Sequence, residues 1–449
     1  MKNNITIIGA GLVGSLLSIY LKRRGYEVKI FERRDDMRKQ EMSAGRSINL
    51  ALSDRGLLAL EKIGLVEEIK KICIPMYGRF IHNKDNSTVT QPYGINNQHI
   101  NSVSRATLNM KLMDLAEENG VEIFFNHKCE NIDWTSNKIT FETNQNQIET
   151  VYFDLLFGSD GAFAASRLAH QIQHSKFDYH QYYIDCGYKE LTIPPTEKGE
   201  FAMEVNALHI WPRKDYMLIA LPNFDKSFTC TLFFPFEGPL SFSNLDSKEK
   251  VEDFFKINFA DVIPLMPNYV EDFFANPTSS LVTVKCYPWI REDKFALIGD
   301  AAHALVPFFG QGMNCGFEDC RILDELIDVH KEDWTTILEV FQNNRKPDAD
   351  AIADLAVNNF VEMRDKTGDA KFLLQKKIEA NIQKKYPEKW TPAYSLVTFS
   401  PHIRYSEALQ RGQQQEAIMQ EIMQLDNIEE IWNSELVEQM ILSKVEILN

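Results

Sequence analysis

The chain has 449 residues, 44% of them hydrophobic, which is enough for two or three domains with substantial cores. Its formal net charge of −16 argues against a nucleic-acid-binding protein and indicates simply a soluble surface. The seven cysteines are scattered without a C-x-x-C pair, and no apolar run reaches the roughly 18 residues of a membrane span, so we expect reduced thiols, a cytoplasmic location, and neither a signal peptide nor a membrane anchor.

The first residues predict a dinucleotide-binding turn. A short β-branched strand, ITII, runs into GAGLVG and then into a helical apolar pattern. In such a turn Gly9 bends the chain, Gly11 lets a pyrophosphate approach and Gly14 allows close helix packing. A second strand over 27–31 ends at Glu32, where an acid accepts hydrogen bonds from a ribose.

The middle of the chain predicts a second strand-to-loop site and an inserted sheet. The segment FDLLFGSDGAFAASR contains a strand that ends at Asp160. Over 182–236, short strands with alternating patterns dominate, which is typical of an antiparallel sheet inserted between parts of a nucleotide-binding fold. Met217, Ile219 and Leu221 alternate on one face, which forms either the wall of a substrate pocket or ordinary sheet core.

A third strand-to-loop site lies in LIGDAAHALVPFFGQGMNCGFEDC. An apolar strand ends at Gly299-Asp300. Pro307 and Gly310 keep the next residues out of a helix, and a helical pattern begins at Gly312. The glycines leave backbone N–H groups open to a ligand above the helix start, which suits an anion or an electron-rich ring. By itself, this pattern is equally consistent with a helix that begins after a turn.

Three dispersed sites favour FAD over a nicotinamide cofactor. In a nicotinamide dehydrogenase one βαβ unit starts a contiguous domain, and nothing later needs to contact the phosphates. An extended FAD would have its adenine end at the first glycines and its flavin at the third site. Asp300 would then bind a ribityl hydroxyl or a ribose oxygen, and the helix near Gly312 would point its N–H groups at the flavin. The sequence has no nucleophile triad, H-E-x-x-H or metal-spaced His/Cys cluster, so we expect no metal site.

Longer motifs indicate a family. The G-x-G-x-x-G start, the DG segment and the GD segment together are similar to the flavoprotein aromatic hydroxylases. Within them, the chain resembles the kynurenine 3-monooxygenase family over roughly residues 5–410, in the segments GRSINLALSDRG, YGRFIH, PYGINNQHINSVSR, LHIWPR, SFTCTLFFPF, VPFFGQGMNCGFEDC and YSLVTFSPHIRY. Eukaryotic members continue into a C-terminal membrane anchor, whereas the tail of this chain is charged throughout.

The resemblance implies an α/β fold: an FAD-binding Rossmann-like domain of the glutathione-reductase type, an inserted antiparallel β-sheet domain for the substrate, and a C-terminal helical region. The expected FAD-binding domain is discontinuous and comprises residues 1–74, 99–175 and 286–345. The expected substrate-binding sheet comprises residues 75–98 and 176–285, and the helical region comprises residues 346–449.

The same resemblance implies an NADPH-dependent flavoprotein monooxygenase. FAD would be tightly bound, NADPH would be a transient co-substrate, and O2 would supply the oxygen that converts L-kynurenine to 3-hydroxy-L-kynurenine in tryptophan degradation. NADPH rather than NADH rests on the resemblance alone, and the oligomeric state stays open. Two alternatives remain: a related hydroxylase of another aromatic acid, and a prenyl-binding chaperone that keeps the scaffold without redox work, against which the complete FFGQGMN loop argues.

Arg79 is the residue that the sequence itself singles out for substrate binding. Its neighbours Tyr77, Phe80 and Ile81 make an apolar setting that is unusual for a solvated arginine. A bidentate guanidinium is the natural partner of a substrate carboxylate, and the alternative is a structural ion pair. By resemblance, the carboxylate-binding positions are Arg79, Tyr93, Asn359 and Tyr394. For Asn359, next to Asn358, a helix-surface amide is an equal alternative.

The full set of expected cofactor positions combines the motif residues with those that the resemblance adds. They are Gly9, Gly11, Val13, Gly14, Phe31, Glu32, Arg33, Arg34, Arg46, Ala51, Arg105, Cys129, Asp160, Asp300 and Gly312, with Met313 and Asn314 at the isoalloxazine. The catalytic loop that would face the substrate comprises Pro307, Phe308, Phe309, Gly310 and Gln311. For His303 we expect a structural hydrogen bond near this loop rather than proton transfer.

Overall fold

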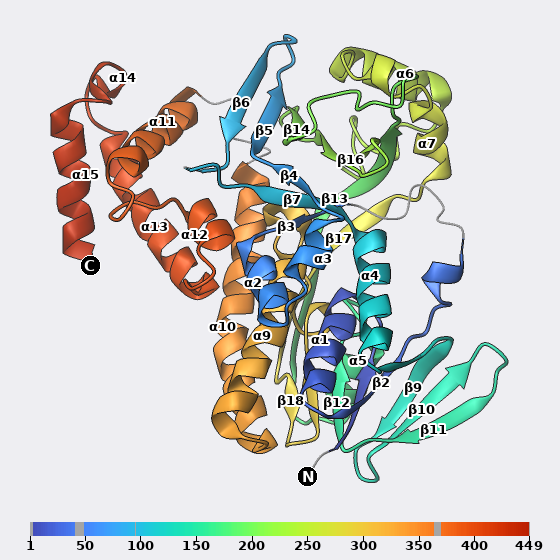
Figure 1. Cartoon of the computed structure of the whole chain (residues 1–449). Helices are drawn as coiled ribbons and strands as arrows, with labels where there is room; N and C mark the ends of the chain where they lie inside the picture. Colours follow the sequence, from blue (N-terminus) through green and yellow to red (C-terminus); the bar gives the residue numbers. More distant parts are fainter. Residues whose placement is uncertain (1–2, 41–48, 95, 363–369, 449) are drawn as a thin grey trace.

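The computed structural model describes residues 3–40, 49–94, 96–362 and 370–448. Within these residues it contains a six-stranded sheet, a seven-stranded sheet and two three-stranded sheets. Figure 1 shows the seven-stranded sheet above the six-stranded one, with the last helices of the chain on the left.

The six-stranded sheet carries the glycine-rich turn. Its strands, in spatial order, are β18 (Ile290–Arg291), β19 (Phe295–Leu297), β12 (Leu155–Gly158), β1 (Asn4–Ile8), β2 (Glu27–Phe31) and β8 (Glu122–Phe124). Neighbouring strands are parallel except β18 with β19. The helices that share its buried core include α1 (Leu12–Arg23), α4 (Arg105–Glu118) and α9 (Gly312–His330). Parallel sheets are buried on both faces, which explains the nearly continuous burial of the central strands β1, β12 and β19.

Two glycines make the turn after β1 possible. Gly9 has a φ of +104°, which L side chains rarely adopt, and a Cβ there would lie 2.7 Å from the Ser159 carbonyl oxygen. A Cβ on Gly14 would lie 2.0 Å from the Gly9 carbonyl oxygen. The turn and the close helix packing expected from these two glycines are therefore both present.

The seven-stranded sheet is mixed. Its strands, in spatial order, are β17 (Ser279–Tyr287), β13 (Asp178–Ile193), β16 (Phe228–Phe234), β15 (Met217–Pro222), β14 (Ala207–Pro212), β5 (Gly78–His82) and β6 (Thr88–Pro92). Neighbouring strands are antiparallel except β14 with β5, which are parallel. The parallel pair joins β14 to β5, which comes from a much earlier segment of the chain.

Two three-stranded sheets and several short helices accompany the two large sheets. One small sheet contains β3 (Asn49–Leu52), β7 (Ile100–Ser104) and β4 (Ile74–Met76), and the other contains β11 (Ile148–Tyr152), β10 (Lys138–Thr143) and β9 (His127–Asp133). The short helices are α2 (Asp54–Lys62), α3 (Val66–Lys70), α5 (Ala165–Ile172), α6 (Lys248–Asn258), α7 (Tyr269–Ala275) and α8 (Asp300–His303). The 3₁₀ turns among the described residues are η1 (Met37–Lys39), η2 (Ile263–Leu265) and η3 (Pro307–Phe309).

The two faces of β15 have different surroundings. Leu218 and Ala220 belong to a buried apolar cluster with residues of α6 and α7. The alternate residues line a cavity and also pack within other apolar clusters: Met217, Ile219 and Leu221. This face is therefore both the wall of a pocket and part of the buried core around it.

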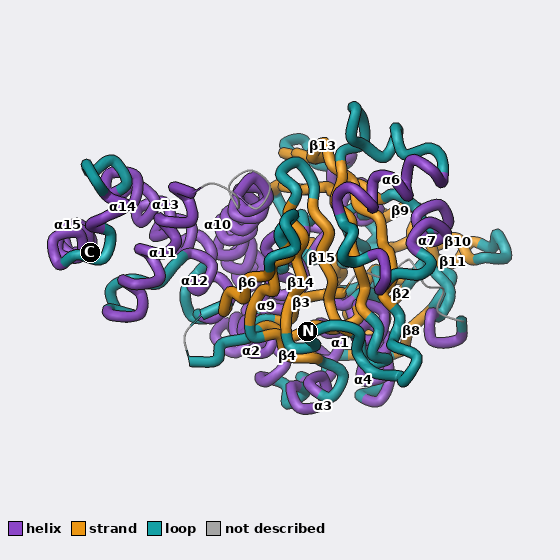
Figure 2. Tube along the Cα trace, turned by 90° about the horizontal axis from the view of Figure 1, so that it is seen from above, coloured by secondary structure: helices purple, strands orange, loops and turns teal. Residues whose placement is uncertain are grey.

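Helices form the last part of the chain. They are α10 (Trp334–Val361), α11 (Ala370–Lys385), α12 (Ala393–Phe399), α13 (Tyr405–Ile422), α14 (Ile428–Ile431) and α15 (Glu435–Leu448). A separate small apolar core joins Ile382 of α11, Met419 of α13 and Ile441 of α15. Viewed from above, these helices gather beside the stranded part of the molecule (Figure 2). None of the described helices is long and apolar enough to cross a membrane.

We propose that the chain divides into domains at the boundaries expected from the sequence. Strands β5 and β6 lie within 75–98, and they join the same sheet as β13 to β16 from 176–285. This pairing supports one substrate-binding domain built from both segments.

Candidate active site

A cavity of about 480 Å³ is lined by both large sheets. The six-stranded sheet contributes the turn after β1 and the end of β2, and the seven-stranded sheet contributes its inner face. The two small sheets, the loop after β12, the loop before α9 and one residue of α12, Tyr394, also contribute to the lining.

Glu32 lies beside the glycine turn, at the end of β2. Its carboxylate oxygens accept hydrogen bonds from the Ala10 backbone nitrogen at 2.9 Å, the Arg34 backbone nitrogen at 3.0 Å and Arg34 Nε at 2.7 Å. Burial would raise the pKa of Glu32, but the hydrogen bonds and charge of Arg34 outweigh it and lower that pKa. The carboxylate is therefore ionised at neutral pH, as an acceptor of ribose hydroxyls must be.

The start of α1 is open toward the cavity. Gly11 is its N-cap residue and has no side chain to bind the first N–H groups. A Cβ added to Gly11 would meet no atom within 4 Å. Free N–H groups and the positive end of the helix dipole fit a pyrophosphate at this position.

Asp160 and Arg167 fix the loop after β12. The Asp160 oxygens accept hydrogen bonds from the Ser166 backbone nitrogen at 3.0 Å and from Ser166 Oγ, and burial raises the pKa of Asp160. Arg167 donates from Nη1 to the Ala301 carbonyl at 2.8 Å and from Nη2 to the Ala162 carbonyl at 2.6 Å. Arg167 thus joins this loop to α8, while Asp160 lines the cavity.

A buried Asp319 fixes the loop after β19. Its Oδ2 accepts hydrogen bonds from the Gly299 nitrogen at 3.1 Å and from His303 Nε2 at 2.6 Å, and its Oδ1 accepts one from Arg345 Nε at 2.7 Å. Burial would lower the pKa of His303, but the charge of Asp319 raises it well above its usual value. His303 therefore has the structural hydrogen bond expected from the sequence, and Asp300 lines the cavity.

His303, Cys315 and Asp319 form the group of potential metal ligands found in the described part of the chain, with ligand atoms within 4.8 Å of one another. The two ring nitrogens of His303 face different partners, Nε2 toward Asp319 and Nδ1 toward Cys315 Sγ at 3.8 Å. Arg345 Nη2 also lies 3.4 Å from Cys315 Sγ, where its charge would repel a cation. The cluster fits a hydrogen-bonded network better than a metal site.

The loop before α9 forms one wall of the cavity. The lining residues of this loop and the helix start are Pro307, Phe308, Phe309, Gly310, Gly312 and Met313. Asn314 lies behind them: its Nδ2 donates to the carbonyls of Ala51 and Gly310, both at 2.8 Å, and its Oδ1 accepts from the Ser53 nitrogen at 3.0 Å. Asn314 therefore shapes the loop from outside the cavity.

Two further side chains lie behind the catalytic loop and do not line the cavity: Gln311, the last residue of the loop, and Asn359 of α10. Gln311 Oε1 accepts a hydrogen bond from the Tyr405 hydroxyl at 2.9 Å. Asn359 Nδ2 donates to the Phe308 carbonyl at 2.7 Å. The structure thus gives both side chains a role in holding the loop. The resemblance places Asn359 at the substrate carboxylate, with a helix-surface amide as the alternative, and places Gln311 in the catalytic loop.

Arg79 lies on the inner face of the seven-stranded sheet between two tyrosines. Its guanidinium is 4.8 Å from the ring centre of Tyr394 and 5.4 Å from that of Tyr93, and the two rings stack at 5.7 Å. Burial raises the pKa of both tyrosines, so both hydroxyls stay protonated. Among the described residues, no carboxylate forms an ion pair with Arg79, and the buried Tyr93 hydroxyl has no hydrogen-bond partner. A cationic fork beside an unpaired hydroxyl fits a ligand carboxylate.

The other expected cofactor positions differ in where they lie. Those that line the cavity are Val13, Phe31, Arg33, Arg34, Ala51, Arg105 and Cys129. Gly14 packs behind the turn, and Arg46 lies outside the described residues. Burial raises the pKa of the Cys129 thiol, which is therefore neutral.

Several lining residues of the seven-stranded sheet are missing from the sequence-based set. They are Tyr188, Leu208, Thr231 and Phe233. On β16, Thr231 pairs with Ile219 and Phe233 pairs with Met217. Because paired residues share a face of the sheet, the strand register would have identified these two from the predicted inner face of β15.

Comparisons with known proteins agree with this geometry. The FAD binding domain family matches residues 2–356. The kynurenine 3-monooxygenase of Flavobacterium psychrophilum is 51% identical to this chain over 450 residues, with 100% of this chain and 99% of that one covered. The kynurenine 3-monooxygenase of Dictyostelium discoideum is 44% identical, with 96% of each chain covered.

The chain belongs to the kynurenine 3-monooxygenase family. The family resemblance predicted from the motifs is therefore confirmed, and it extends beyond residue 410. As a member of this family, the chain is an FAD-dependent flavoprotein monooxygenase.

Solved structures show the fold of this member of the kynurenine 3-monooxygenase family. The 2-methyl-3-hydroxypyridine-5-carboxylic acid oxygenase matches with a TM-score of 0.66 at 19% identity, with 83% of this chain and 95% of that chain covered. The tetracycline destructase Tet(51) matches with a TM-score of 0.59 at 18% identity, with 85% and 98% covered. The predicted α/β fold with an FAD-binding domain and a C-terminal helical region is confirmed.

Proposed function

We propose that this protein hydroxylates L-kynurenine at the ring 3-position, giving 3-hydroxy-L-kynurenine and consuming NADPH and O2. The observation that carries the proposal is Arg79, a cavity cation without an ion-pair partner among the described residues, beside the unpaired Tyr93 hydroxyl. An amino-acid substrate brings a carboxylate that would be costly to bury unpaired. The relatives from Flavobacterium psychrophilum and Dictyostelium discoideum are both named kynurenine 3-monooxygenase, which supports the same substrate here.

The expected cofactor positions fit an extended FAD that reaches from the glycine turn after β1 to the start of α9. Gly11 and Glu32 would hold its adenosine and pyrophosphate, and Asp300 with the start of α9 would hold its flavin end. The FAD-binding residues that we propose are those expected from the sequence. Among them, Asn314 and Gly14 hold the backbone that would contact FAD, Asn314 through the Gly310 carbonyl and Gly14 by close packing on Gly9. When bound, FAD supplies the redox chemistry that activates O2.

The chain itself binds and orients the substrate and excludes water. We infer that Arg79, with Tyr93 and Tyr394, binds the substrate carboxylate, and that Asn359 acts through the Phe308 carbonyl that it holds. In the catalytic loop, the Phe309 ring stacks on Tyr394 at 5.4 Å. Apolar walls of this kind hold the aromatic ring of the substrate in place and keep water away from the reacting atoms.

The seven cysteines support our further proposal of a cytoplasmic location. All seven are buried as thiols, without a disulfide between them. Persistent free thiols are typical of a reducing compartment.

The test of the proposed function is NADPH oxidation with and without L-kynurenine, combined with mass analysis of the product. We expect kynurenine to accelerate NADPH consumption and the product to carry one added oxygen atom. A panel of other aromatic acids scored by product separates the related-hydroxylase alternative. A rate of NADPH oxidation that does not depend on kynurenine, with no oxygenated product, would contradict the proposal. A colourless protein that does not bind added FAD would favour the chaperone alternative.

A further inference from the structure

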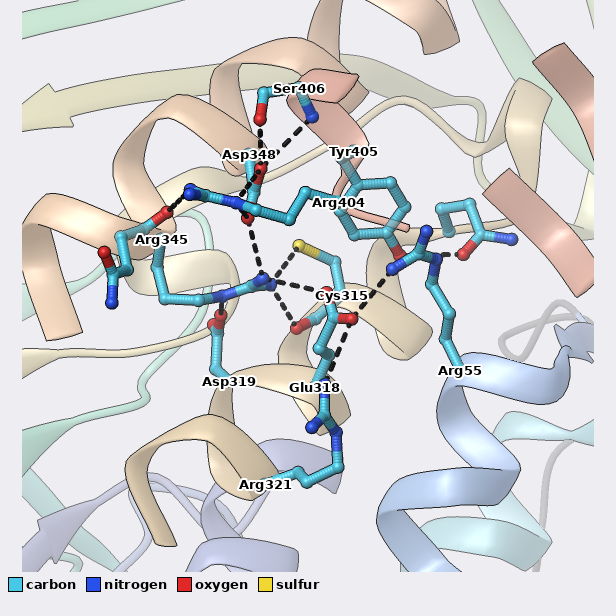
Figure 3. Close-up of polar contacts among 12 residues, drawn as sticks. Arg55, Cys315, Glu318, Asp319, Arg321, Arg345, Asp348, Arg404, Tyr405 and Ser406 are labelled. Carbon is cyan, nitrogen blue, oxygen red and sulfur yellow. Dashed lines mark hydrogen bonds and ion pairs between the residues drawn. The ribbon is translucent and has the colours of Figure 1, made fainter. Parts of the chain in front are cut away.

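Arg55 is a buried cation outside the cavity. It belongs to the LSDRG sequence at the start of α2, and it is 1% exposed. Figure 3 shows its guanidinium reaching Glu318 of α9, in the same network as Arg345 and Asp348. None of the roles assigned above to cavity residues explains why a charge is buried here.

The Arg55 guanidinium binds the C-terminal end of α12. Its Nε donates to the Val397 carbonyl at 2.6 Å, and its Nη2 donates to the carbonyls of Leu396 at 3.4 Å and of the C-cap residue Ser400 at 3.3 Å. The same Nη2 donates to the Ile403 carbonyl in the loop that follows the helix. The last carbonyls of a helix have no partner within the helix and carry the negative end of its dipole. A buried arginine at this point therefore fixes the end of α12.

The same guanidinium is fixed on its other side. Its Nη1 donates to Glu318 Oε1 at 2.8 Å, and it lies 4.0 Å from the ring centre of Tyr405. Glu318 is held in turn by Arg345 Nη1 at 2.8 Å. Since α9 begins at the cavity with Gly312, Arg55 connects the helix of the cofactor loop to α12.

Tyr394 stands in the first turn of α12, at the end away from Arg55. The helix has seven residues, so its two ends move together. The Tyr394 ring faces Phe309 at 5.4 Å and the Arg79 guanidinium at 4.8 Å. A displacement of the helix at Val397 would therefore change the distance between Tyr394 and Arg79.

We propose that Arg55 is a positioning residue for the substrate carboxylate: by clamping α12 it sets the place of Tyr394 opposite Arg79. This inference rests on the proposed function, in which these two side chains bind the carboxylate. The planar fork of arginine is needed because one cation must serve several carbonyls and Glu318 at once, and lysine offers a compact charge instead.

Gly412 provides a second, independent contact on the same helix. It lies on α13, and a Cβ added there would come 2.9 Å from the Ala393 Cβ, next to Tyr394. Alanine is favoured over glycine inside a helix, so Gly412→Ala should leave α13 intact while pushing the start of α12. This variant displaces Tyr394 without removing a charge.

The experiment compares the affinities of the FAD-loaded protein for L-kynurenine and for its decarboxylated analogue. In Arg55→Lys we expect the kynurenine dissociation constant to rise about tenfold, because small misplacements of binding groups have large effects, while the value for the analogue is nearly unchanged. Gly412→Ala should shift the ratio of the two affinities in the same direction. FAD content and the melting temperature are measured in parallel.

Matched controls separate positioning from general damage. Arg24 also pairs with α9, through Asp324 and Asp328, so Arg24→Lys weakens a more exposed ion pair on the same helix. Gln413 is the exposed neighbour of Gly412, so Gln413→Ala changes α13 without pressing on Ala393. Both controls should keep the wild-type ratio of affinities.

The outcomes distinguish the inference from the function on which it rests. If wild type does not prefer kynurenine to the decarboxylated analogue, the proposed function fails. If wild type does, but Arg55→Lys loses both affinities equally or keeps the wild-type ratio, Arg55 only supports the fold and the inference is overturned. Should Arg55→Lys not fold, Gly412→Ala decides: a shifted ratio supports the positioning of α12, and a wild-type ratio overturns it.

Discussion

At the scale of single residues, Arg79 gives the sharpest test of the carboxylate site. Arg79→Ala should weaken kynurenine binding by about 2 to 5 kcal/mol, since a desolvated carboxylate is left without its partner. Arg79→Lys should recover only part of this loss, because an ammonium cannot make the planar two-bond contact. Ligand titration of the FAD-loaded variants measures both effects.

The control for Arg79 is the decarboxylated analogue, which should lose little further affinity in either variant. FAD content should equal that of wild type. Equal losses for the two ligands, or release of FAD, would mean that Arg79 holds the fold and does not bind the carboxylate.

Asp300 is the residue expected to bind the flavin end of the cofactor. Asp300→Ala should lower FAD retention while the fold persists, because one charge-assisted hydrogen bond of about 1.5 to 3 kcal/mol is lost. The apoprotein fraction after gel filtration measures it. Asp215→Ala, at an exposed position between β14 and β15, is the control. An apoprotein fraction unchanged in Asp300→Ala would refute this role.

Among single residues, sequence reasoning works where the role depends on local backbone or on intrinsic chemistry. Gly9 and Gly14 follow from motif spacing, and both have the steric surroundings that the motif requires. The directions of Asn314 and Gln311 do not follow from their neighbours, because each side chain is turned by a partner distant in sequence, such as the Ala51 carbonyl or the Tyr405 hydroxyl.

At the scale of elements, the start of α1 separates stability from cofactor binding. A Cβ on Gly14 would meet the Gly9 carbonyl oxygen at 2.0 Å, so Gly14→Ala should destabilise even the FAD-free protein, by about 1 to 3 kcal/mol or more. A Cβ on Gly11 meets nothing within 4 Å, so Gly11→Ala should keep that stability and instead weaken FAD binding. Unfolding of the apoproteins and FAD titration check the pair. Equal apoprotein stability for the two variants would contradict the packing argument.

The outer face of the seven-stranded sheet contains a histidine pair that makes stability depend on pH. His82 Nε2 of β5 lies 3.0 Å from His209 Nδ1 of β14, and the His82 ring stacks on Trp211. Burial, together with the neighbouring His209, lowers the pKa of His82 from 6.5 to about 4. The folded protein therefore disfavours a proton that the unfolded chain accepts.

Between pH 6.5 and pH 4 the unfolded chain binds this proton and the folded protein does not, so stability should fall as the pH drops through this window and level off below it. The loss from this group is on the order of 3 kcal/mol. Urea unfolding across this window should show a weaker pH dependence for His82→Gln than for wild type. Identical slopes for the two proteins would rule out His82 as the cause.

The elements themselves were largely predictable, but their long-range pairing was not. The strands β1 and β19 match the apolar runs read from the sequence, because strands buried on both faces need continuous apolar residues. Strand β2 matches the strand expected over 27–31, although Glu27 and Lys29 are exposed. The parallel pairing of β14 with β5 joins segments more than a hundred residues apart, and no local pattern encodes it.

At the scale of the whole molecule, the cavity is built from parts that are far apart in the chain. The glycine turn, β5, the inner face of the sheet, the loop before α9 and Tyr394 all contribute to it. The fold class, and most of the segments that contribute to the cavity, could be predicted from motifs and family resemblance. The contact of α12 with Arg55 could not, because backbone carbonyls accept it and leave no signature in the sequence.

The late position of Tyr394 determines the order in which a ribosome delivers the two halves of the site. Every expected FAD position has been synthesised once Asn314 has, whereas Tyr394 and the Tyr405 that packs on Arg55 belong to a later stretch of the chain. In the proposed division of the chain the FAD-binding domain ends at residue 345, so all of its residues have been synthesised before Tyr394 is added. Tyr394 is therefore the last of the cavity residues to be made.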